Sequence, residues 1–427
     1  MKSLDLKFTA NFNLIPIFLI LFLPVFIILG SGILNTAIII LDFLFLGTII
    51  KNRNITIFKN KFFYFILALW IYLLINLFFF SVNFDNSFLR SIGFVRFLFF
   101  VFAIKYFLEI ENNKYYNFII KSWTLIFLFI SFDLFYEFYT GENILGFSAE
   151  LPGRLVGFLK DEMKIGHFYL AFILITVNTI SEFLTHKKSN NNIVRKFIFY
   201  LIVLFLFVVS FLIGERANFV RIFLVLVLFL NIFQKNYKIN LSIIIICIAI
   251  FTFITLNNER FKQRFWITFL SPLINNPIKS LFLKPYGDHY EAALEVNKRN
   301  KVFGVGLRNY SNEADKNIYA KNPSVHPHQL YFEFLAELGW VGFFVFLFFF
   351  SYSLYYGIIS YFKYRNPYKF CATLFIFSQI LPFIPSGSFF TTYGAALFWI
   401  NYAILITNKK INFFFLTKSN NLDKSLY

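Results

Sequence analysis

The stretch SVHPHQLYFEFLAELGWVG, residues 324–342, separates the longest polar segment of the chain from a strongly apolar one. It carries two of the five histidines, His326 and His328, on either side of a proline that is suited to a helix start. Glu333 and Glu337 follow one turn apart, on one face of that helix. The stretch predicts a junction where ionisable groups meet a membrane-spanning helix.

Long apolar runs recur on both sides of this junction. The chain has 427 residues, 58% of them hydrophobic, and runs of this length are typical of membrane spans, because only a helix satisfies its own backbone in lipid. We expect an all-α integral membrane protein with about twelve transmembrane helices. They are placed at 14–30, 33–50, 62–80, 88–107, 117–138, 165–184, 194–213, 217–233, 239–256, 329–361, 368–384 and 390–407.

Lysine and arginine gather in alternate connections between these spans. The connections near 30–32, 82–87 and 385–391 have none, whereas those near 51–61, 114–121 and 363–369 have several. By the positive-inside rule the basic connections and both chain termini are expected to be cytoplasmic. The net charge of +18 then reflects contact with anionic membrane lipids, and we expect no nucleic-acid partner.

Two outer segments are long, 139–164 and 257–327. The second is expected to form a helical cap, with a short helix at 289–300 and a buried turn at 302–307, where glycine permits close backbone approach. The predicted organisation is 1–256 for helices one to nine, 257–327 for the cap, and 328–427 for helices ten to twelve and a cytoplasmic tail. A helix over 329–361 would be about 50 Å long, so its first turns should stand outside the roughly 30 Å lipid core.

His328 is the first candidate for chemistry. A neutral imidazole at the mouth of a membrane bundle can take a proton from a hydroxyl near neutral pH. The plainer alternative is a histidine that only caps a helix. The closeness of His326 and Glu333 in the sequence favours a functional reading.

Arg216 is a candidate for binding a phosphate group. It lies in a short outer turn, IGERAN, where a guanidinium and the free N–H groups of a helix start suit an anion. Alternatively, Arg216 pairs with Glu215 beside it. Arg221 lies deeper in the same helix, where a charge is functional or else paired, here with Asp133 or Glu137.

Arg154 lies in LPGRLVGFLKDE, residues 151–162, and suggests a turn that faces a ligand, although a solvated loop is the alternative. For Asp288 and His289 the default reading is a helix cap. Weaker candidates of the same kind are Arg90, Arg96, Arg260, Arg264 and Arg308.

Several motifs are missing from the sequence. It has no Walker motif, HExxH, serine nucleophile elbow, CxxC, or Asp-x-Asp pair in the outer loops, and its two cysteines lie inside apolar runs. A metal-free site with one base and several arginines is the economical reading. Such a site suits transfer of a group away from a pyrophosphate, because the arginines stabilise the leaving charge.

Taken in order, these segments resemble the O-antigen ligase and polymerase family of bacterial envelope glycosyltransferases. The matching pieces are Arg154–Gly157 with Asp161 and Glu162, Gly214–Arg216, Asp288–Tyr290, Phe303–Gly306, His326–Tyr331 and Glu337–Gly342. Two positions depart from the family pattern. Gln329 stands where the family usually has asparagine, and Glu215 stands where serine is common.

The resemblance implies a metal-independent, inverting transferase of the GT-C type that needs no cofactor. The donor would be a glycan on undecaprenyl pyrophosphate, used at the periplasmic face of the bacterial inner membrane. His328 would be the catalytic base, and Arg216, Arg154 and Arg221 would bind the pyrophosphate. Supporting positions would be His326, His289, Glu337 and Arg308.

Three functions remain open from the sequence. A ligase would use a sugar hydroxyl of the lipid A core as acceptor, and this reading is preferred. A polymerase would extend another lipid-linked repeat with the same base and the same arginines. A polysaccharide flippase or transporter also suits about twelve spans, but no half-to-half repeat is visible and the polar residues gather at the outer surface.

Overall fold

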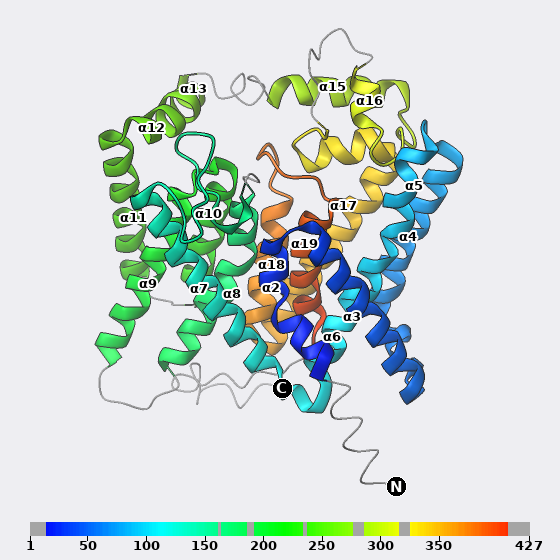
Figure 1. The fold of residues 1–427 in the computed structure, drawn as a ribbon, viewed down its shortest axis with the longest axis horizontal. Helices are drawn as coiled ribbons and strands as arrows, with labels where there is room; N and C mark the ends of the chain where they lie inside the picture. The colour runs from blue at the N-terminus through cyan, green and yellow to red at the C-terminus, as the bar shows by residue number, and fades with distance from the viewer. Residues whose placement is uncertain are drawn as a thin grey trace, which may run out of the picture.

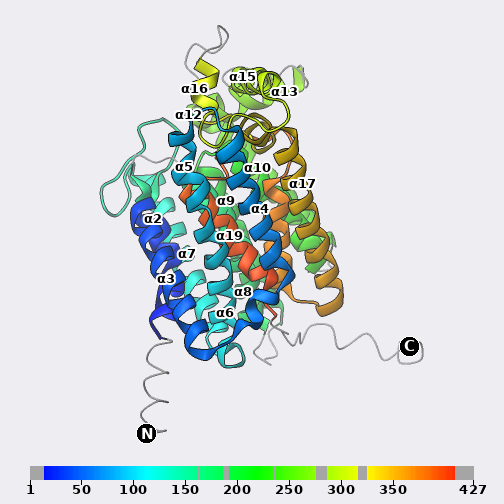
Figure 2. The ribbon, with the colours of Figure 1, turned by 90° about the vertical axis from the view of Figure 1, so that its right-hand side faces the viewer.

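In the computed structural model, the described residues are 14–160, 164–185, 192–233, 237–275, 286–315 and 325–408, and every regular element within them is a helix. The predicted all-α class is therefore confirmed. Long helices form one bundle, and the short helices between residues 257 and 330 lie together at one end, which we name the cap face (Figure 1, Figure 2).

The bundle consists of a helix at 14–21, α2 (Leu23–Leu29), α3 (Ser31–Asn52), the 3₁₀ helix η1 (Ile55–Lys59), α4 (Lys61–Phe80), α5 (Phe84–Gly93), α6 (Val95–Asn113), α7 (Tyr116–Thr140), α8 (Ile165–Thr185), α9 (Asn192–Leu212), α10 (Arg216–Phe233), α11 (Tyr237–Asn257), α17 (Leu330–Tyr364), α18 (Pro367–Gln379) and α19 (Thr392–Ile406). The cap consists of α12 (Glu259–Phe261), the π-helix η3 (Lys262–Leu270), α13 (Ser271–Asn275), α15 (Tyr286–Arg299) and α16 (Tyr310–Asp315). The short 3₁₀ helix η2 (Gly157–Leu159) lies in the connection before α8.

In the described part of the chain, nine helices are long and apolar enough to cross a membrane. The chain is thus a multi-pass membrane protein by its helix content. Three predicted spans are shorter: the first is interrupted at Phe22, α18 has 13 residues and α19 has 15. A total of twelve crossings, and the division of the chain built on it, stay predictions.

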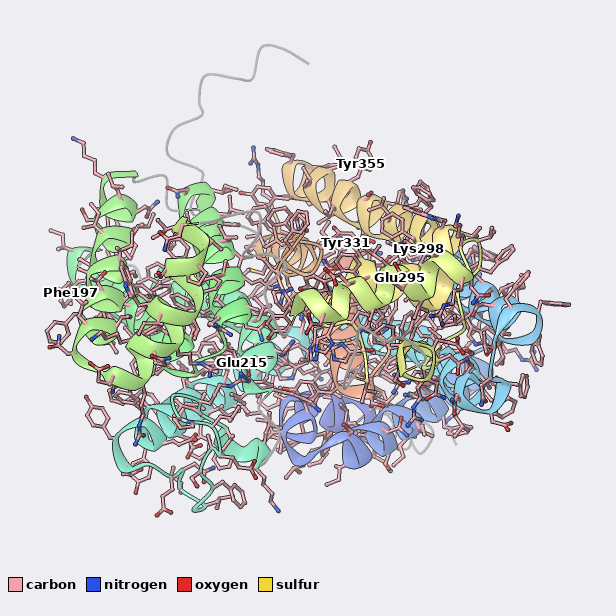
Figure 3. All side chains as sticks on the ribbon, turned by 90° about the horizontal axis from the view of Figure 1, so that it is seen from above. Phe197, Glu215, Glu295, Lys298, Tyr331 and Tyr355 are labelled. Atoms are coloured by element: carbon pink, nitrogen blue, oxygen red, sulfur yellow. The ribbon has the colours of Figure 1, made fainter. Side chains whose placement is uncertain are left out.

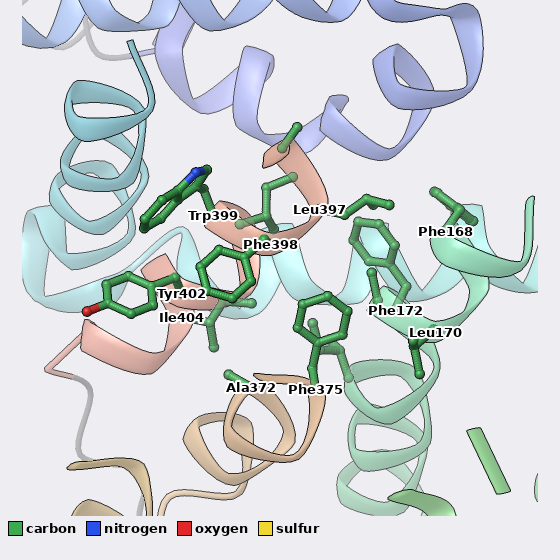
Figure 4. Packing of buried hydrophobic residues seen from close by; sticks show 14 of the residues in the cluster. Phe168, Leu170, Phe172, Ala372, Phe375, Leu397, Phe398, Trp399, Tyr402 and Ile404 are labelled. Atoms are coloured by element: carbon green, nitrogen blue, oxygen red, sulfur yellow. The ribbon is translucent and has the colours of Figure 1, made fainter. Parts of the chain in front are cut away.

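The two short helices α18 and α19 lie in the centre of the bundle (Figure 1). Nearly all of their side chains are buried, and Phe375 and Leu397 lie there beside Phe172 of α8 (Figure 4). Protein rather than lipid surrounds both helices, so neither needs the full length of a membrane span.

An irregular segment, the 380–391 loop, separates α18 from α19. The prediction of helix up to residue 384 was wrong, because α18 ends at Gln379. Pro382 and Pro385 cannot continue a helix, and the residue before each proline is biased away from helical backbone. Non-helical backbone inside a membrane bundle is tolerated where it is covered by protein or lines a cavity.

The cap meets the bundle along a seam made by backbone groups. Four backbone N–H groups donate across it: Trp340 to Lys301 O (2.9 Å), Val341 to Val302 O (3.0 Å), Val305 to Ala336 O (3.1 Å) and Gly306 to Glu337 O (2.8 Å). The predicted buried turn over 302–307 forms half of this seam. The predicted cap helix is α15, which begins at Tyr286 rather than His289.

The seam also breaks α17. Gly339 has φ 67, and a Cβ there or at Gly304 would collide with the backbone on the other side. The predicted helix over 329–361 is therefore present as α17, but it is interrupted at Gly339 and does not run continuously for about 50 Å. Residues 330–338 lie under the cap, and the part after the break would be about 37 Å long at 1.5 Å per residue.

The end opposite the cap face carries the basic connections. Those between α3 and α4, α6 and α7, and α17 and α18 lie there (Figure 1, Figure 2). Their cations include Arg53, Lys59, Lys114, Lys363 and Arg365. The helix at 14–21 begins, and α19 ends, at this same end.

Candidate functional site

A cavity of about 800 Å³ lies between the cap and the bundle. Its lining includes four of the predicted residues: Arg154, Arg216, His326 and His328. We name the three histidines His289, His326 and His328 the imidazole group, and Arg154, Arg216 and Arg264 the arginine group. The cap, the bundle and the 380–391 loop all contribute to this one cavity.

His328 is held in an uncommon backbone conformation. Its φ is 56, in the left-handed region, where a residue other than glycine persists only if its surroundings fix it. Its N–H donates to His326 Nδ1 at 2.9 Å, and its carbonyl accepts the N–H of Ser386 at 2.8 Å. Gln329, not His328, caps α17, because its side chain accepts backbone N–H groups of the first turn. The reading of His328 as a simple helix cap was therefore wrong.

The members of the imidazole group touch one another. The ring centroids of His326 and His328 lie 4.2 Å apart, and those of His289 and His328 lie 5.2 Å apart. His289 stands in the first turn of α15, so the cap supplies one imidazole and the chain leading into α17 supplies two. The structure thus brings together three histidines that the sequence placed in two segments.

Burial keeps this group uncharged. It lowers the pKa of His328 from 6.5 to about 4, with a smaller contribution from His289. Burial also lowers the pKa of His326 to about 3, assisted by the charges that His328, His167, His289 and Arg90 can carry. The pKa of His289 is lowered by burial, against an opposing effect of Asp288. At pH 7 these imidazoles are neutral and able to accept a proton.

The arginine group comes from three separate segments. Arg154 lies in the connection before α8, Arg216 begins α10, and Arg264 lies in η3. The N–H of Leu155 donates to Ile213 O at 3.2 Å, which ties the first segment to the turn before α10.

The three segments are also joined by their arginines and glycines. Arg264 Nε donates to Gly214 O at 2.7 Å, and Arg216 Nη1 donates to Thr268 Oγ1 at 3.2 Å. Gly214 has φ 75, and a Cβ there would collide with the carbonyl of Gly153. Glycine at position 214 therefore allows the arginine-bearing segments to meet.

Cations outnumber anions on the cavity wall. Among the described residues, the charged side chains in its lining are Arg154, Lys164, Arg216, Arg264 and Glu215, which is four cations and one carboxylate. Burial, assisted by repulsion from Arg154 and Arg216, lowers the pKa of Arg264 to about 10. A bound anion would relieve this repulsion, and guanidinium groups suit phosphate oxygens in particular.

Glu215 pairs with Arg154 and His167, so the predicted pair with Arg216 was wrong. Glu215 is 6% exposed, and its carboxylate lies 3.7 Å from Arg154 Nη2 and 3.5 Å from His167 Nδ1. It also accepts the N–H of Gly166 at 3.0 Å. Burial raises the pKa of Glu215, but His167, Arg154 and that N–H together bring it below its ordinary value. Viewed from above, Glu215 lies to one side of α15 (Figure 3).

Arg221 is absent from the cavity lining. It is 1% exposed and donates to the carbonyls of Ser378 (3.0 Å) and Ile384 (3.1 Å) and to Asn218 Oδ1 (3.3 Å). The predicted alternative, a pair with Asp133 or Glu137, is also not observed. Arg221 instead fixes the 380–391 loop, so its guanidinium is already occupied by protein partners.

Two further predicted residues belong to the seam. Glu337 is buried and accepts the N–H of Arg308 at 2.9 Å, while the Arg308 side chain is exposed. Neither lines the cavity. Arg154, in contrast, is 17% exposed and lines it, so the reading of a solvated loop was wrong. Asp161 and Glu162 lie outside the described residues.

Sequence reasoning missed two lining residues and undervalued a third. Lys164 and His167 were not singled out, and Arg264 was only a weaker candidate. The one available signal for His167 was its place in the first turn of an apolar helix, directly after a charged segment. Within the described ranges, no group of three or more His, Cys, Asp or Glu is placed to hold a metal ion.

Residues 201–347 match a family model described as O-antigen ligase. The matched segment runs from α9 into α17 and contains the imidazole group, Arg216 and Arg264. Arg154 and the 380–391 loop lie outside it and complete the same cavity. No curated protein sequence matches the chain. Over residues 201–347 the chain is therefore similar to the O-antigen ligase family, in line with the resemblance carried by its motifs.

Proposed function

We propose that this protein is an O-antigen ligase-type, metal-independent, inverting glycosyltransferase of the GT-C type. It moves a glycan from undecaprenyl pyrophosphate to a sugar hydroxyl of the lipid A core. One observation carries the proposal: a single cavity holds neutral imidazoles together with four cations and one carboxylate. Transfer away from a pyrophosphate needs both a base and stabilisation of the leaving charge.

The reaction is a single displacement at the anomeric carbon of the donor. His328 accepts the proton of the acceptor hydroxyl while the hydroxyl oxygen forms the new bond to that carbon. The bond from carbon to the pyrophosphate oxygen breaks, and its electron pair leaves with the carrier pyrophosphate. The arginine group and Lys164 stabilise the added negative charge, and one displacement inverts the anomeric configuration.

The arrangement of charge along the bundle supports a periplasmic site. The basic connections lie at the end opposite the cap face, and the positive-inside rule assigns that end to the cytoplasm. The cavity under the cap then faces the periplasm of the inner membrane, and both termini face the cytoplasm. Lipid-linked donor and acceptor would both reach the cavity from the membrane.

A polymerase of the same family would use the same base and the same cations, so the cavity chemistry supports both activities. The two differ in the acceptor: a lipid A-core sugar for the ligase, and a second carrier-linked glycan for the polymerase. Supplying each acceptor to purified protein with one donor separates them. Product on the core sugar alone supports the ligase, and elongation on the carrier alone would replace it with the polymerase.

His328→Asn is the sharpest variant for testing the base. Asparagine tolerates the left-handed backbone at this position but cannot act as a base near pH 7. We expect transfer by protein purified in detergent to fall about 100- to 10,000-fold, the range typical of a lost general base. The thermal unfolding midpoint should stay within a few degrees of wild type.

Lys298→Ala is a matched control, because Lys298 lies on the cap helix α15 with its side chain 65% exposed. It should transfer glycan at the wild-type rate. Wild-type rates for His328→Asn would remove the base from the proposal. Absence of glycan transfer by wild-type protein in detergent, together with carriage across sealed vesicles, would favour the transporter.

A further inference from the structure

His167 lines the cavity next to Glu215 and has no part in the mechanism above. It lies in the first turn of α8, outside the segment matched by the family model. Its side chain is 28% exposed, and its Nδ1 lies 3.0 Å from Asn218 Nδ2. The inference below concerns the other ring nitrogen, Nε2, and rests on the proposed function.

The orientation of the Asn218 amide is fixed by two neighbours. Arg221 can only donate, and its Nη1 lies 3.3 Å from Asn218 Oδ1. The carboxylate of Glu215 can only accept, and its Oε2 lies 2.6 Å from Asn218 Nδ2. Both contacts require the amide nitrogen to face Glu215 and His167.

This orientation decides where His167 carries its hydrogen. The second N–H of Asn218 points to His167 Nδ1, so a neutral imidazole accepts at Nδ1 and carries its hydrogen on Nε2. A protonated imidazole also carries a hydrogen on Nε2. In either state Nε2 is a hydrogen-bond donor.

That donor has no acceptor in the described part of the protein. Nε2 of His167 is buried and without a hydrogen-bond partner. A Cβ added at Gly387 in the 380–391 loop would lie 3.4 Å from Nε2. A side chain at position 387 would therefore contact Nε2, and glycine avoids that contact.

We propose that His167 binds the donor pyrophosphate by donating its Nε2 hydrogen to a phosphate oxygen. Arg154 and Glu215 stand beside it, and Lys164 and Arg216 line the same cavity. A site that offers donors and cations suits an oxyanion, which only accepts, better than a sugar hydroxyl, which must also donate. Asn218 is a positioning residue, because it acts by fixing the hydrogen on Nε2.

Inorganic pyrophosphate is the probe for this contact, read out as a shift in the thermal unfolding midpoint of purified protein in detergent. His167→Ala should weaken pyrophosphate binding about tenfold or more, as expected for a lost hydrogen bond to a charged group. His167→Gln, which can place an N–H near the position of Nε2, should recover most of the affinity.

Gly387→Ala is a second variant that leaves the imidazole in place. Its Cβ fits without a clash but fills the space in front of Nε2, so binding should weaken several-fold while the fold is kept. The matched control is Gly47→Ala in α3, where a Cβ meets nothing within 4 Å. Gly47→Ala should bind pyrophosphate as wild type does.

The outcomes separate the contact from the proposed function. If His167→Ala and Gly387→Ala bind pyrophosphate as tightly as wild type while Arg216→Ala does not, His167 makes no such contact and the proposed function stands. If wild-type protein fails to bind pyrophosphate, the proposed function itself fails. Equal weakening by His167→Gln and His167→Ala would also overturn the inference, because a donor at this position would then not matter.

Discussion

His326 and His328 of the imidazole group line the same cavity as the arginine group, yet burial leaves the two groups in opposite charge states. It lowers the pKa of His328 from 6.5 to about 4, and it lowers that of Arg264 to about 10. The first shift leaves a side chain neutral at pH 7, and the second leaves a side chain charged. A single enclosed space can therefore hold a neutral base beside cations without a wall between them.

Arg216→Ala should test the cationic side of the comparison, and it is the variant expected to lose both glycan transfer and pyrophosphate binding. Loss of one preorganised cation at a leaving group costs about 100- to 1,000-fold in transfer rate. Pyrophosphate binding should be lost with it, because the same side chain would hold the bound anion. Rates under single-turnover conditions and the pyrophosphate-induced shift of the unfolding midpoint measure the two losses.

His328→Asn is the matched comparison for that variant. It should lose transfer but keep pyrophosphate binding, since the imidazole group is assigned to the acceptor and not to the anion. Loss of pyrophosphate binding in both variants would merge the two groups into one functional unit.

Arg221→Met should show by its loss of stability that Arg221 has a structural role, in contrast to Arg216, which is assigned to pyrophosphate binding. The substitution leaves two carbonyls and Asn218 Oδ1 without their buried donor, which costs about 3 kcal/mol or more of stability. Thermal unfolding in detergent should show a clear drop in midpoint. Arg216→Met, at a partly exposed position, should lower it much less, and similar drops would contradict the assignment of Arg221 to the loop.

The smallest predicted effect is on the pH profile. With a pKa of about 4 for His328, kcat/KM should change less than about twofold between pH 7 and pH 5. Below pH 5 kcat/KM should fall, because His328 becomes protonated. A base with an ordinary pKa of 6.5 would already lose most of its activity at pH 5. A profile that halves near pH 6.5 would contradict burial of the base.

The free energy of unfolding should also depend on pH through His326 and His328, and it should decrease as the pH falls. The unfolded chain binds protons at His326 and His328 near pH 6.5, whereas the folded chain does not until about pH 4 or 3. Stability is therefore lost as pH falls from about 6.5 toward 4, because the unfolded state binds more protons in that range. Unfolding midpoints measured across this range check the sign.

The features of this molecule that could be predicted are those that depend on residues close together in the sequence. Long apolar runs located most of the long helices, and His326 and His328, two positions apart, predicted two of the three members of the imidazole group. The early end of α18 was missed, because hydropathy continued past Gln379 while Pro382 and Pro385 ended the helix. At this point hydropathy favoured a longer helix, whereas the prolines restricted the backbone, and the helix ended.

The arginine group could not be predicted as a set, because its members meet only after folding. Glu215 is adjacent to Arg216 in sequence, yet its carboxylate turns toward the start of α8 and pairs with Arg154 and His167. Arg264 reaches Gly214 across fifty positions of sequence. Contacts over such separations leave no periodic or compositional trace in a single chain.

The seam between cap and bundle has a consequence for how such proteins can diverge. Four of its hydrogen bonds join main-chain atoms only, so many of its side chains can change without loosening these four bonds. Exceptions are Glu337, whose carboxylate accepts the N–H of Arg308, and Gly304 and Gly339, where a Cβ has no room. A chimaera that exchanges residues 286–338 between two such proteins should keep its joint if both carry this glycine pair.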